Sequence, residues 1–241
     1  MNSDDRGEII ALHKNGQVHL FAGTAVGSLA FREIIDTGVT DCREVLAPGD
    51  INGDEEADLV YVTNTGDLYL RPGAGGGRIT NQSVKMGNGW TGWRAIPVGD
   101  LNGDGKADLL GIQESTGLLY MYRGLGNGMF GTKVQVGNGW QNFDLYAAGD
   151  LNGDRRGDIL GVERSTGLLY TYTGNGSGTF NTKVRTGNGW NAFTLAGGGD
   201  LTGDGLADIV GRDDSNGDLY YYRGLGGVKG FATKKLIGSG W

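Results

Sequence analysis

Cysteine, proline and histidine are scarce in this chain of 241 residues, which contains one cysteine, three prolines and two histidines. A single cysteine, Cys42, excludes a framework of internal disulfides. We expect Cys42 to be a small apolar residue near a strand. A catalytic cysteine needs a histidine partner, and no motif surrounds His13 or His19 that would activate Cys42 as a nucleophile. The sequence offers no Ser–His–Asp or Cys–His set, so we expect that the protein is not an enzyme.

Long hydrophobic runs and basic clusters are also missing. No apolar run approaches the ~18 residues that a membrane-spanning helix needs, so we expect no membrane insertion. The first ten residues, MNSDDRGEII, are polar and lack the hydrophobic core of a signal peptide, which suggests a mature or excised domain. No cluster of lysine and arginine favours a nucleic-acid partner.

Glycine, in contrast, is abundant, with 49 residues, and acidic residues outnumber basic ones by 28 to 21, for a net charge of −7. There is no G-x-y period, which excludes collagen. Glycine at this level favours many tight turns between short strands.

An internal repeat organises the chain. Acidic segments typified by GDLNGDGKADLL begin at a constant spacing of 50 residues, at Gly49, Gly99, Gly149 and Gly199. A strand-like marker typified by TGLLYMYRG follows each one, and each unit closes with GNGW or GSGW, ending at Trp90, Trp140, Trp190 and Trp241. Residues 7–23 form a degenerate first copy that lacks the leading Gly-Asp and the tryptophan. Such recurrence predicts a repeat architecture.

Each unit contains four short strands separated by Gly, Asn, Ser and Thr clusters, and no stretch has a helical period. In and around the third copy we expect strands at Ala107–Ile112, Leu118–Arg123, Lys133–Val136 and Asp144–Ala148. This pattern predicts an all-β fold, a β-propeller of about five four-stranded blades in one domain over residues 1–241. The repeats cover approximately residues 1–48, 49–98, 99–148, 149–198 and 199–241.

The strand that precedes the acidic segment occurs only four times, whereas the other three strands occur five times. Either residues 1–6 supply the missing strand, or the propeller closes imperfectly, or the chain is cut from something larger.

The acidic segments place oxygen-bearing side chains at positions 1, 3, 5 and 9 of a tight loop, where a backbone carbonyl near position 7 can join them. Ca²⁺ takes six to eight oxygen ligands in a flexible cage, so we predict about four Ca²⁺ sites. We call these segments loops A to D. Loop A contains Asp50, Asn52, Asp54, Glu56 and Asp58; loop B Asp100, Asn102, Asp104, Lys106 and Asp108; loop C Asp150, Asn152, Asp154, Arg156 and Asp158; loop D Asp200, Thr202, Asp204, Leu206 and Asp208. The first copy offers only Asn2, Asp4 and Glu8, and we expect it to be empty or weak.

The alternative is that Asp-Gly turns merely favour tight bends. That reading explains one loop, but it does not explain three carboxylates within nine residues in four copies, because close like charges repel. Removing the twelve loop aspartates from the 28 acids leaves 16 acids against 21 bases. Four Ca²⁺ would therefore change the net charge from −7 to about +1.

The loop motif G-D-x-N-G-D-G-x-x-D-[LI], placed after a strand, resembles the FG-GAP/VCBS repeat family, whose best-known members are the propeller heads of integrin α chains. The resemblance covers essentially the whole chain and implies a propeller with a mainly structural Ca²⁺ in each loop. The units Trp140 with Phe143 and Trp190 with Phe193 are also similar to those of five-bladed tachylectin-type lectins, although those lectins lack the aspartate loop.

For function, we predict a carbohydrate-binding or surface-adhesion module, because repeated blades present repeated shallow sites. The candidate ligand-binding residues are Trp90, Trp140 and Trp190 with Asn88, Asn138 and Asn188, two residues before each tryptophan. The alternative for these tryptophans, and for Tyr69, Tyr120, Tyr170 and Tyr220, is packing. The alternative function is a protein-interaction module attached to a secreted hydrolase. Loops this simple predict weak extracellular calcium affinity, so we expect a secreted protein whose partner is a glycan or an extracellular or cell-surface protein.

Overall fold

The computed structural model describes residues 6–241. These residues form five β-sheets and two short 3-10 helices. The first sheet contains β1 (Glu8–Leu12), β2 (Val18–Gly23) and β3 (Leu29–Asp36). The second contains β4 (Cys42–Gly49), β5 (Asp58–Thr63), β6 (Leu68–Arg71) and β7 (Val84–Gly87). The third contains β8 (Trp93–Gly99), β9 (Asp108–Gln113), β10 (Leu118–Tyr122) and β11 (Val134–Gly137).

The fourth sheet contains β12 (Phe143–Gly149), β13 (Asp158–Glu163), β14 (Leu169–Tyr172) and β15 (Val184–Gly187). The fifth contains β16 (Phe193–Gly197), β17 (Ile209–Asp213), β18 (Leu219–Tyr222) and β19 (Lys235–Gly238). The 3-10 helices are η1 (Trp140–Asn142) and η2 (Gly227–Lys229). None of the helices in the described part of the chain has the length and apolarity needed to span a bilayer.

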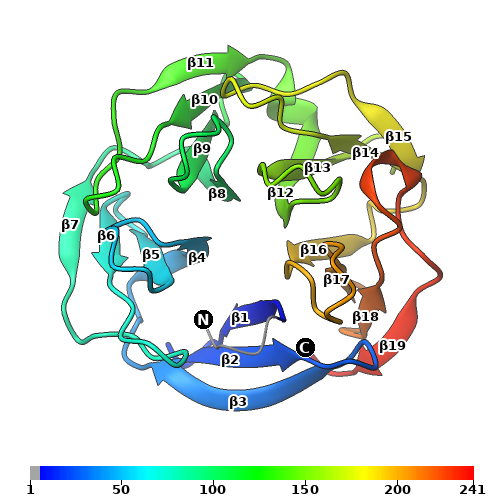
Figure 1. The fold of residues 1–241 in the computed structure, drawn as a ribbon, viewed down its shortest axis with the longest axis horizontal. Helices are drawn as coiled ribbons and strands as arrows, with labels where there is room; N and C mark the ends of the chain where they lie inside the picture. Colours follow the sequence, from blue (N-terminus) through cyan, green and yellow to red (C-terminus); the bar gives the residue numbers. More distant parts are fainter. Residues whose placement is uncertain (1–5) are drawn as a thin grey trace. The chain divides into compact units, whose positions relative to one another are not determined.

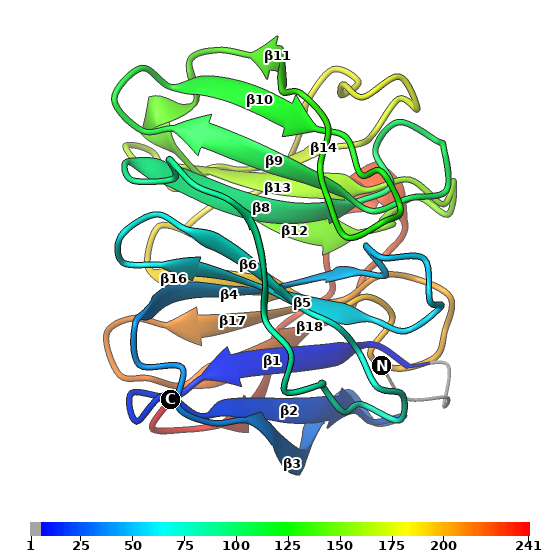
Figure 2. The same cartoon turned by 90° about the vertical axis from the view of Figure 1, so that its left-hand side faces the viewer.

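Strands follow one another in chain order within every sheet, as the second sheet in Figure 1 and the third sheet in Figure 2 show. The all-β class and the five-bladed β-propeller are therefore confirmed. The first blade has three strands among the described residues, because this copy lacks the Gly-Asp strand that opens each of the others. The strands expected around the third copy are found within one or two residues, as β9, β10, β11 and β12.

Burial explains the composition of the strands. The second strands β5, β9 and β13 are buried on both faces, which requires the continuous apolar runs seen in these segments. The third strands alternate between buried and half-buried residues, which is the period of a strand with one covered face. The repeat thus sets one fully buried strand beside one amphipathic strand in each blade.

The chain divides into two compact units, each with its own core. The first contains residues 10–21 and 31–141, and buries Val60, Val62 and Leu109 together with Trp90. The second contains residues 6–9, 22–30 and 142–241, and buries Leu160, Val162 and Ile209 together. That residues 1–241 form one domain stays a prediction.

Trp90 closes the second repeat and packs against the third. Trp90 is 5% exposed, and its ring centroid lies 5.0 Å from that of Tyr122 in β10. A Cβ added to Gly111 would lie 3.2 Å from the Trp90 ring, so glycine at this place in β9 makes room for the indole.

The first copy lacks the tryptophan, and a polar cluster takes its place. Asp36, at the end of β3, accepts a hydrogen bond from the Tyr61 hydroxyl at 2.6 Å and pairs with Arg71 at 2.6 Å. Tyr61 stands in β5 where β9 has Gly111, so the larger side chain fills the space of an absent indole. Burial beside Asp36 raises the pKa of Tyr61.

Candidate metal and ligand sites

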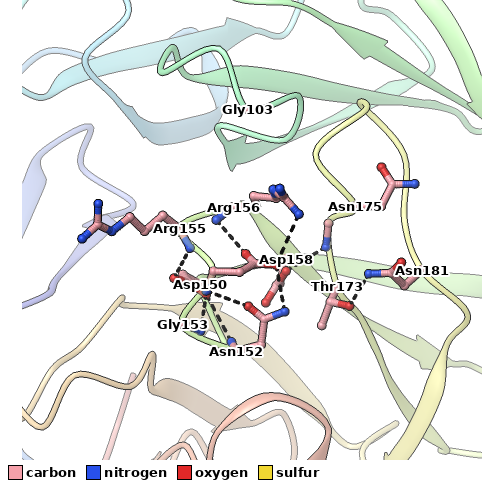
Figure 3. Close-up of polar contacts among 12 residues, drawn as sticks. Gly103, Asp150, Asn152, Gly153, Arg155, Arg156, Asp158, Thr173, Asn175 and Asn181 are labelled. Atoms are coloured by element: carbon pink, nitrogen blue, oxygen red, sulfur yellow. Dashed lines mark hydrogen bonds and ion pairs between the residues drawn. The ribbon is translucent and has the colours of Figure 1, made fainter.

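Loops A to D each connect the first strand of a blade to the second. Loop C, between β12 and β13, is drawn in Figure 3, where dashed lines join its aspartate and asparagine side chains to nearby backbone amides, while the Arg155 side chain extends away. The four loops share this arrangement, so loop C describes them all except where stated.

The aspartate at position 9 is the buried end of each loop. Asp158 is 0% exposed, and its two oxygens accept N–H bonds from Leu151 and Gly174, both at 2.8 Å. The same two bonds occur at Asp58, Asp108 and Asp208, with distances of 2.8–3.0 Å. This carboxylate therefore connects the start of the loop to the second residue after the third strand.

The glycine that donates to position 9 recurs in all four copies, as Gly73, Gly124, Gly174 and Gly224. A Cβ at Gly124 would lie 2.1 Å from the carbonyl oxygen of Ala107, which leaves no space for any side chain. Sequence reasoning missed this pairing of an aspartate with a distant glycine, although both recur at a fixed spacing of 15 or 16 residues.

The exposed end of each loop is held by turns in which side chains accept backbone hydrogens. Asp150 accepts from the amides of Gly153 at 2.7 Å and Arg155 at 2.6 Å. Asp154 accepts from the amide of Arg156 at 2.9 Å, and Asn152 accepts from that of Asp154 at 3.0 Å. Positions 1, 3 and 5 thus fold the loop around their own oxygens.

Position 6 is left-handed in all four loops, although only two of them have glycine there. Gly105 and Gly205 have φ values of 82° and 85°, whereas Glu55 and Arg155 adopt 69° and 65°. A side chain in this region costs roughly 1–2 kcal/mol, so loops A and C carry strain that loops B and D avoid.

Burial makes the position 9 carboxylates weaker acids than usual. Desolvation raises the pKa of Asp108 and of Asp158 to about 6, against the amide hydrogen bonds that lower it. The pKa values of Asp58 and Asp208 are raised for the same first reason. Each of these carboxylates would gain from a nearby positive charge.

The loops differ in charge. Over nine residues, loop A has five acids and no base, loop B three acids and one lysine, loop C three acids and two arginines, and loop D three acids and no base. Arg156 lies 3.8 Å from Asp154 in loop C, and Arg223 lies 3.5 Å from Asp204 in loop D. Two of the four loops therefore hold a cationic side chain beside position 5.

The donor set fits Ca²⁺ in its chemistry, because positions 1, 3, 5 and 9 each offer an oxygen atom. Loop D adds the hydroxyl of the buried Tyr221, which lies beside Thr202 and Asp208. Among residues 6–241, however, no three His, Cys, Asp or Glu side chains gather into a group that could hold a metal ion. A cation would therefore compete with the loop amides for the same oxygens.

In the first copy, Asn2 and Asp4 lie outside the described residues, and Glu8 begins β1. Whether this copy holds an ion stays a prediction.

The tryptophans and the asparagines that precede them differ in solvent exposure. Trp90 is buried, whereas Trp140 and Trp190 are half-buried. Trp190 packs on Tyr222 with ring centroids 4.7 Å apart. The residues Asn88, Asn138 and Asn188 are exposed. Packing thus occupies most of the Trp90 surface, and the other two tryptophans keep part of theirs in solvent.

A cluster that sequence reasoning did not anticipate surrounds the tyrosine series. In the third blade, the Lys133 ammonium lies 4.2 Å from the ring centre of Trp93 and 4.7 Å from that of Tyr120. Lys183 covers Phe143 and Tyr170 in the same way, and Lys234 covers Phe193 and Tyr220, at 4.0–5.1 Å. The recurring Thr-Lys pair before the fourth strand was the available signal. These lysines occupy the aromatic faces by cation–π attraction.

Cys42 lies in β4, half-buried, as expected of a residue in a strand. Its Sγ donates to the carbonyl of Glu44 at 2.8 Å, and burial raises the pKa of the thiol.

Comparison with solved structures supports the fold. An Agrocybe aegerita lectin, solved for its recognition of non-reducing terminal N-acetylglucosamine, aligns with 96% of this chain at 20% identity and a TM-score of 0.53. The chain spans 65% of that lectin, which agrees with the looser resemblance to lectin propellers. A Photorhabdus luminescens Tc holotoxin pore aligns with 92% of the chain at 15% identity and a TM-score of 0.49, and the chain spans 12% of it.

No curated protein matches the sequence. A sequence profile described as an FG-GAP-like repeat matches residues 50–111, 100–161 and 150–211, each match running from one acidic loop past the next. The matches together extend from residue 50 to residue 211, more than half of the 241 residues. The chain therefore belongs to the FG-GAP-like repeat family.

Proposed function

We propose that this chain is a binding module without catalytic activity, that its ligand is a glycan, and that Ca²⁺ in loops A to D stabilises its blades. The observation that carries the glycan assignment is the fold shared with a lectin that recognises N-acetylglucosamine, over 96% of the chain. Half-buried Trp140 and Trp190, with exposed Asn138 and Asn188 beside them, offer the apolar faces and amides that sugars bind.

Calcium is supported by four copies of a loop with oxygen-bearing side chains and by the way in which loops A and C bond to the following blade. The carbonyl of Ile51 in loop A accepts a hydrogen bond from Gly128 of the following blade at 3.0 Å, and that of Leu151 in loop C accepts one from Gly227. An ion that fixes a loop would also fix this connection, so its binding energy would add to folding stability.

The expected calcium affinity is weak, because the ion must displace amide hydrogens from the carboxylates. Affinities of roughly 10⁻⁴–10⁻³ M are typical of extracellular modules, and such sites fill only where calcium is plentiful. We therefore propose that the protein acts outside the cell.

The binding role is also supported by the state of the cysteine. A reactive cysteine needs a lowered pKa, whereas burial raises that of Cys42 and its thiol donates to a carbonyl. The aspartates at positions 1, 5 and 9, for their part, recur in four repeats rather than being gathered at one place.

A glycan array, probed with the labelled chain in millimolar CaCl₂ and again with a chelator, tests the proposal. We expect binding to a restricted set of glycans that weakens when calcium is removed. Binding to no glycan would contradict the glycan assignment and leave a protein partner as the alternative. Hydrolysis of an arrayed glycan would contradict the absence of catalysis.

Calcium is tested separately by thermal unfolding. We expect the melting temperature to rise with CaCl₂ concentration across the millimolar range and to return to its starting value after chelation. MgCl₂ is the control, because Mg²⁺ prefers rigid octahedral sites with several waters and should act less. An unchanged melting temperature in calcium would contradict the metal assignment.

A further inference from the structure

The first blade departs from the repeat at the place where the third, fourth and fifth blades carry their lysine-covered aromatic pairs. His19 stands in β2 where Tyr120 stands in β10, four places before the glycine that ends each marker. Its ring centroid lies 5.5 Å from that of Phe31 in β3, at an interplanar angle of 67°. Phe21 contacts the same phenyl ring, with centroids 5.7 Å apart.

A second imidazole extends this cluster. His13 follows β1 and stacks on His19 with the ring planes 6° from parallel and the centroids 5.6 Å apart. Strands β2 and β3 and the residue after β1 thus place His13, His19, Phe21 and Phe31 in one group, which we call the first-blade aromatic cluster.

The cluster faces solvent. Phe31 is 54% exposed, and His13 is also exposed. Within residues 6–241 no lysine or arginine lies over the Phe31 ring, whereas lysines occupy the aromatic faces in the third, fourth and fifth blades. An exposed aromatic face attracts partial positive charge, and the first blade leaves this attraction available to a ligand.

A cavity of about 280 Å³ adjoins the cluster and shares His13 with it. Leu12 and Val39 supply apolar wall, while Lys14 and Thr40 supply a cation and a hydroxyl. The hollow thus sets apolar and polar groups side by side, and small-ligand sites likewise combine apolar walls with a few placed polar groups. Sugars match such a surface, since one face of a pyranose is lined with C–H groups and its rim with hydroxyls.

We propose that the first-blade aromatic cluster and its cavity form a binding site for a single pyranose unit of a glycan. The sugar stacks its C–H face on Phe31 and His13 and directs hydroxyls to Lys14 and Thr40. This inference rests on the proposed glycan-binding function and assigns it to the blade that departs from the repeat, rather than to the four regular ones.

The two histidines of the chain are both in this cluster, so their ring signals in a ¹H–¹³C NMR spectrum report on it without any mutation. The unmodified protein is titrated with N-acetylglucosamine, galactose and mannose, and binding heat is measured in parallel. We expect the His13 and His19 signals to shift with the same midpoint as the heat.

Phe31→Ala is expected to weaken that sugar's binding roughly tenfold, the loss of one aromatic stacking contact. Val134→Ala, which truncates an apolar side chain that is 63% exposed in β11, is the matched control and should leave affinity unchanged. Equal melting temperatures for the two variants establish that Phe31→Ala folds.

Sugar binding that leaves both histidine signals unmoved would overturn the assignment of this site while leaving the glycan function in place. Affinity unaffected by Phe31→Ala would do the same. Binding heat absent for all three sugars and for every arrayed glycan would overturn the proposed function, and this site with it.

Discussion

At the scale of single residues, the nine positions of an acidic loop divide into a buried carboxylate that holds the fold and exposed oxygens that shape a turn. Asp158 has its two oxygens bonded to amides that have no other acceptor in the loop, whereas Asp154 lies at the exposed end. The sequence motif gives these two aspartates the same apparent role, and the structure distinguishes them.

Asp158→Asn is expected to destabilise the metal-free protein by about 1–3 kcal/mol, because an amide group would leave one of two buried N–H donors without an acceptor. Asp154→Asn is the matched control and should cost far less, since its environment is exposed. Urea unfolding in the presence of chelator measures both. Equal costs would contradict a special structural role for position 9.

Backbone conformation at position 6 gives a second prediction. Gly105→Ala is expected to destabilise by about 1 kcal/mol, because φ is 82° at this residue. Arg155→Gly, at the equivalent residue with φ of 65°, should instead be neutral or slightly stabilising, since it relieves strain. Thermal unfolding of both variants in the presence of chelator, with loops B and C metal-free, compares them. A loss of stability in Arg155→Gly would contradict the expected relief of backbone strain.

At the scale of the loop as an element, the net charge ranks the four candidate calcium sites. Loop A carries five acids and no base, whereas loop C carries two arginines, one of them 3.8 Å from Asp154. A cationic side chain at position 7 repels an incoming Ca²⁺ and competes for the carboxylate it needs. We therefore expect loop A to bind most tightly and loop C most weakly.

Neutralising position 7 tests this ranking. Arg156→Gln should strengthen calcium binding in loop C, and Glu56→Gln, the same position in loop A, should weaken it, each by up to roughly thirtyfold, since a unit charge about 4 Å from a divalent ion contributes about 2 kcal/mol in water. Calorimetric Ca²⁺ titrations resolve the tightest and weakest sites. Changes in the same direction for both variants would contradict an electrostatic ranking.

At the scale of the whole molecule, buried tyrosines predict how stability depends on alkaline pH. Burial raises the pKa of Tyr172 and of Tyr222 to about 12, from an ordinary value of 10. Below pH 10 both hydroxyls are protonated in the folded and unfolded chains. Between pH 10 and 12 the unfolded chain releases protons that the folded chain retains, so unfolding becomes more favourable as pH rises.

The free energy of unfolding, obtained from urea titrations between pH 8 and pH 11.5, should be level at first and then fall. The slope should be about 1.4 kcal/mol per pH unit for each buried tyrosine. Tyr172→Phe should remove one such contribution and flatten the alkaline limb. An unchanged slope in this variant would show that its hydroxyl ionises equally in both states.

The repeat made most of the fold predictable. A 50-residue spacing of four strand-like segments sufficed to place β9 to β12 within one or two residues. It also located the missing strand of the first blade, because the Gly-Asp segment is absent from residues 7–23. Strand positions follow from the local alternation of apolar and polar residues, and this alternation can be read from the sequence directly.

Partners that lie far apart along the chain were less accessible. The pattern identifies Asp158 as an oxygen donor but does not reveal that Gly174 supplies its hydrogen, because that bond depends on where the third strand ends. The lysine over Tyr120 and the stacking of His13 on His19 depend likewise on which strand faces which. Whether loops A to D bind calcium stays a prediction.

The bond from Asp158 to Gly174 lies within a single copy, and so does the bond from Asp58 to Gly73. Between copies, the connection from Gly128 to Ile51 runs from one main chain to another and uses no side chain, although the φ of 82° at Gly128 favours glycine there. A repeat of this kind therefore contains its own stabilising hydrogen bonds and contacts the next repeat through its main chain. A gene of this kind can duplicate or change one repeat at a time. A single copy can therefore acquire an exposed aromatic surface while the other copies keep their lysine-covered aromatic residues.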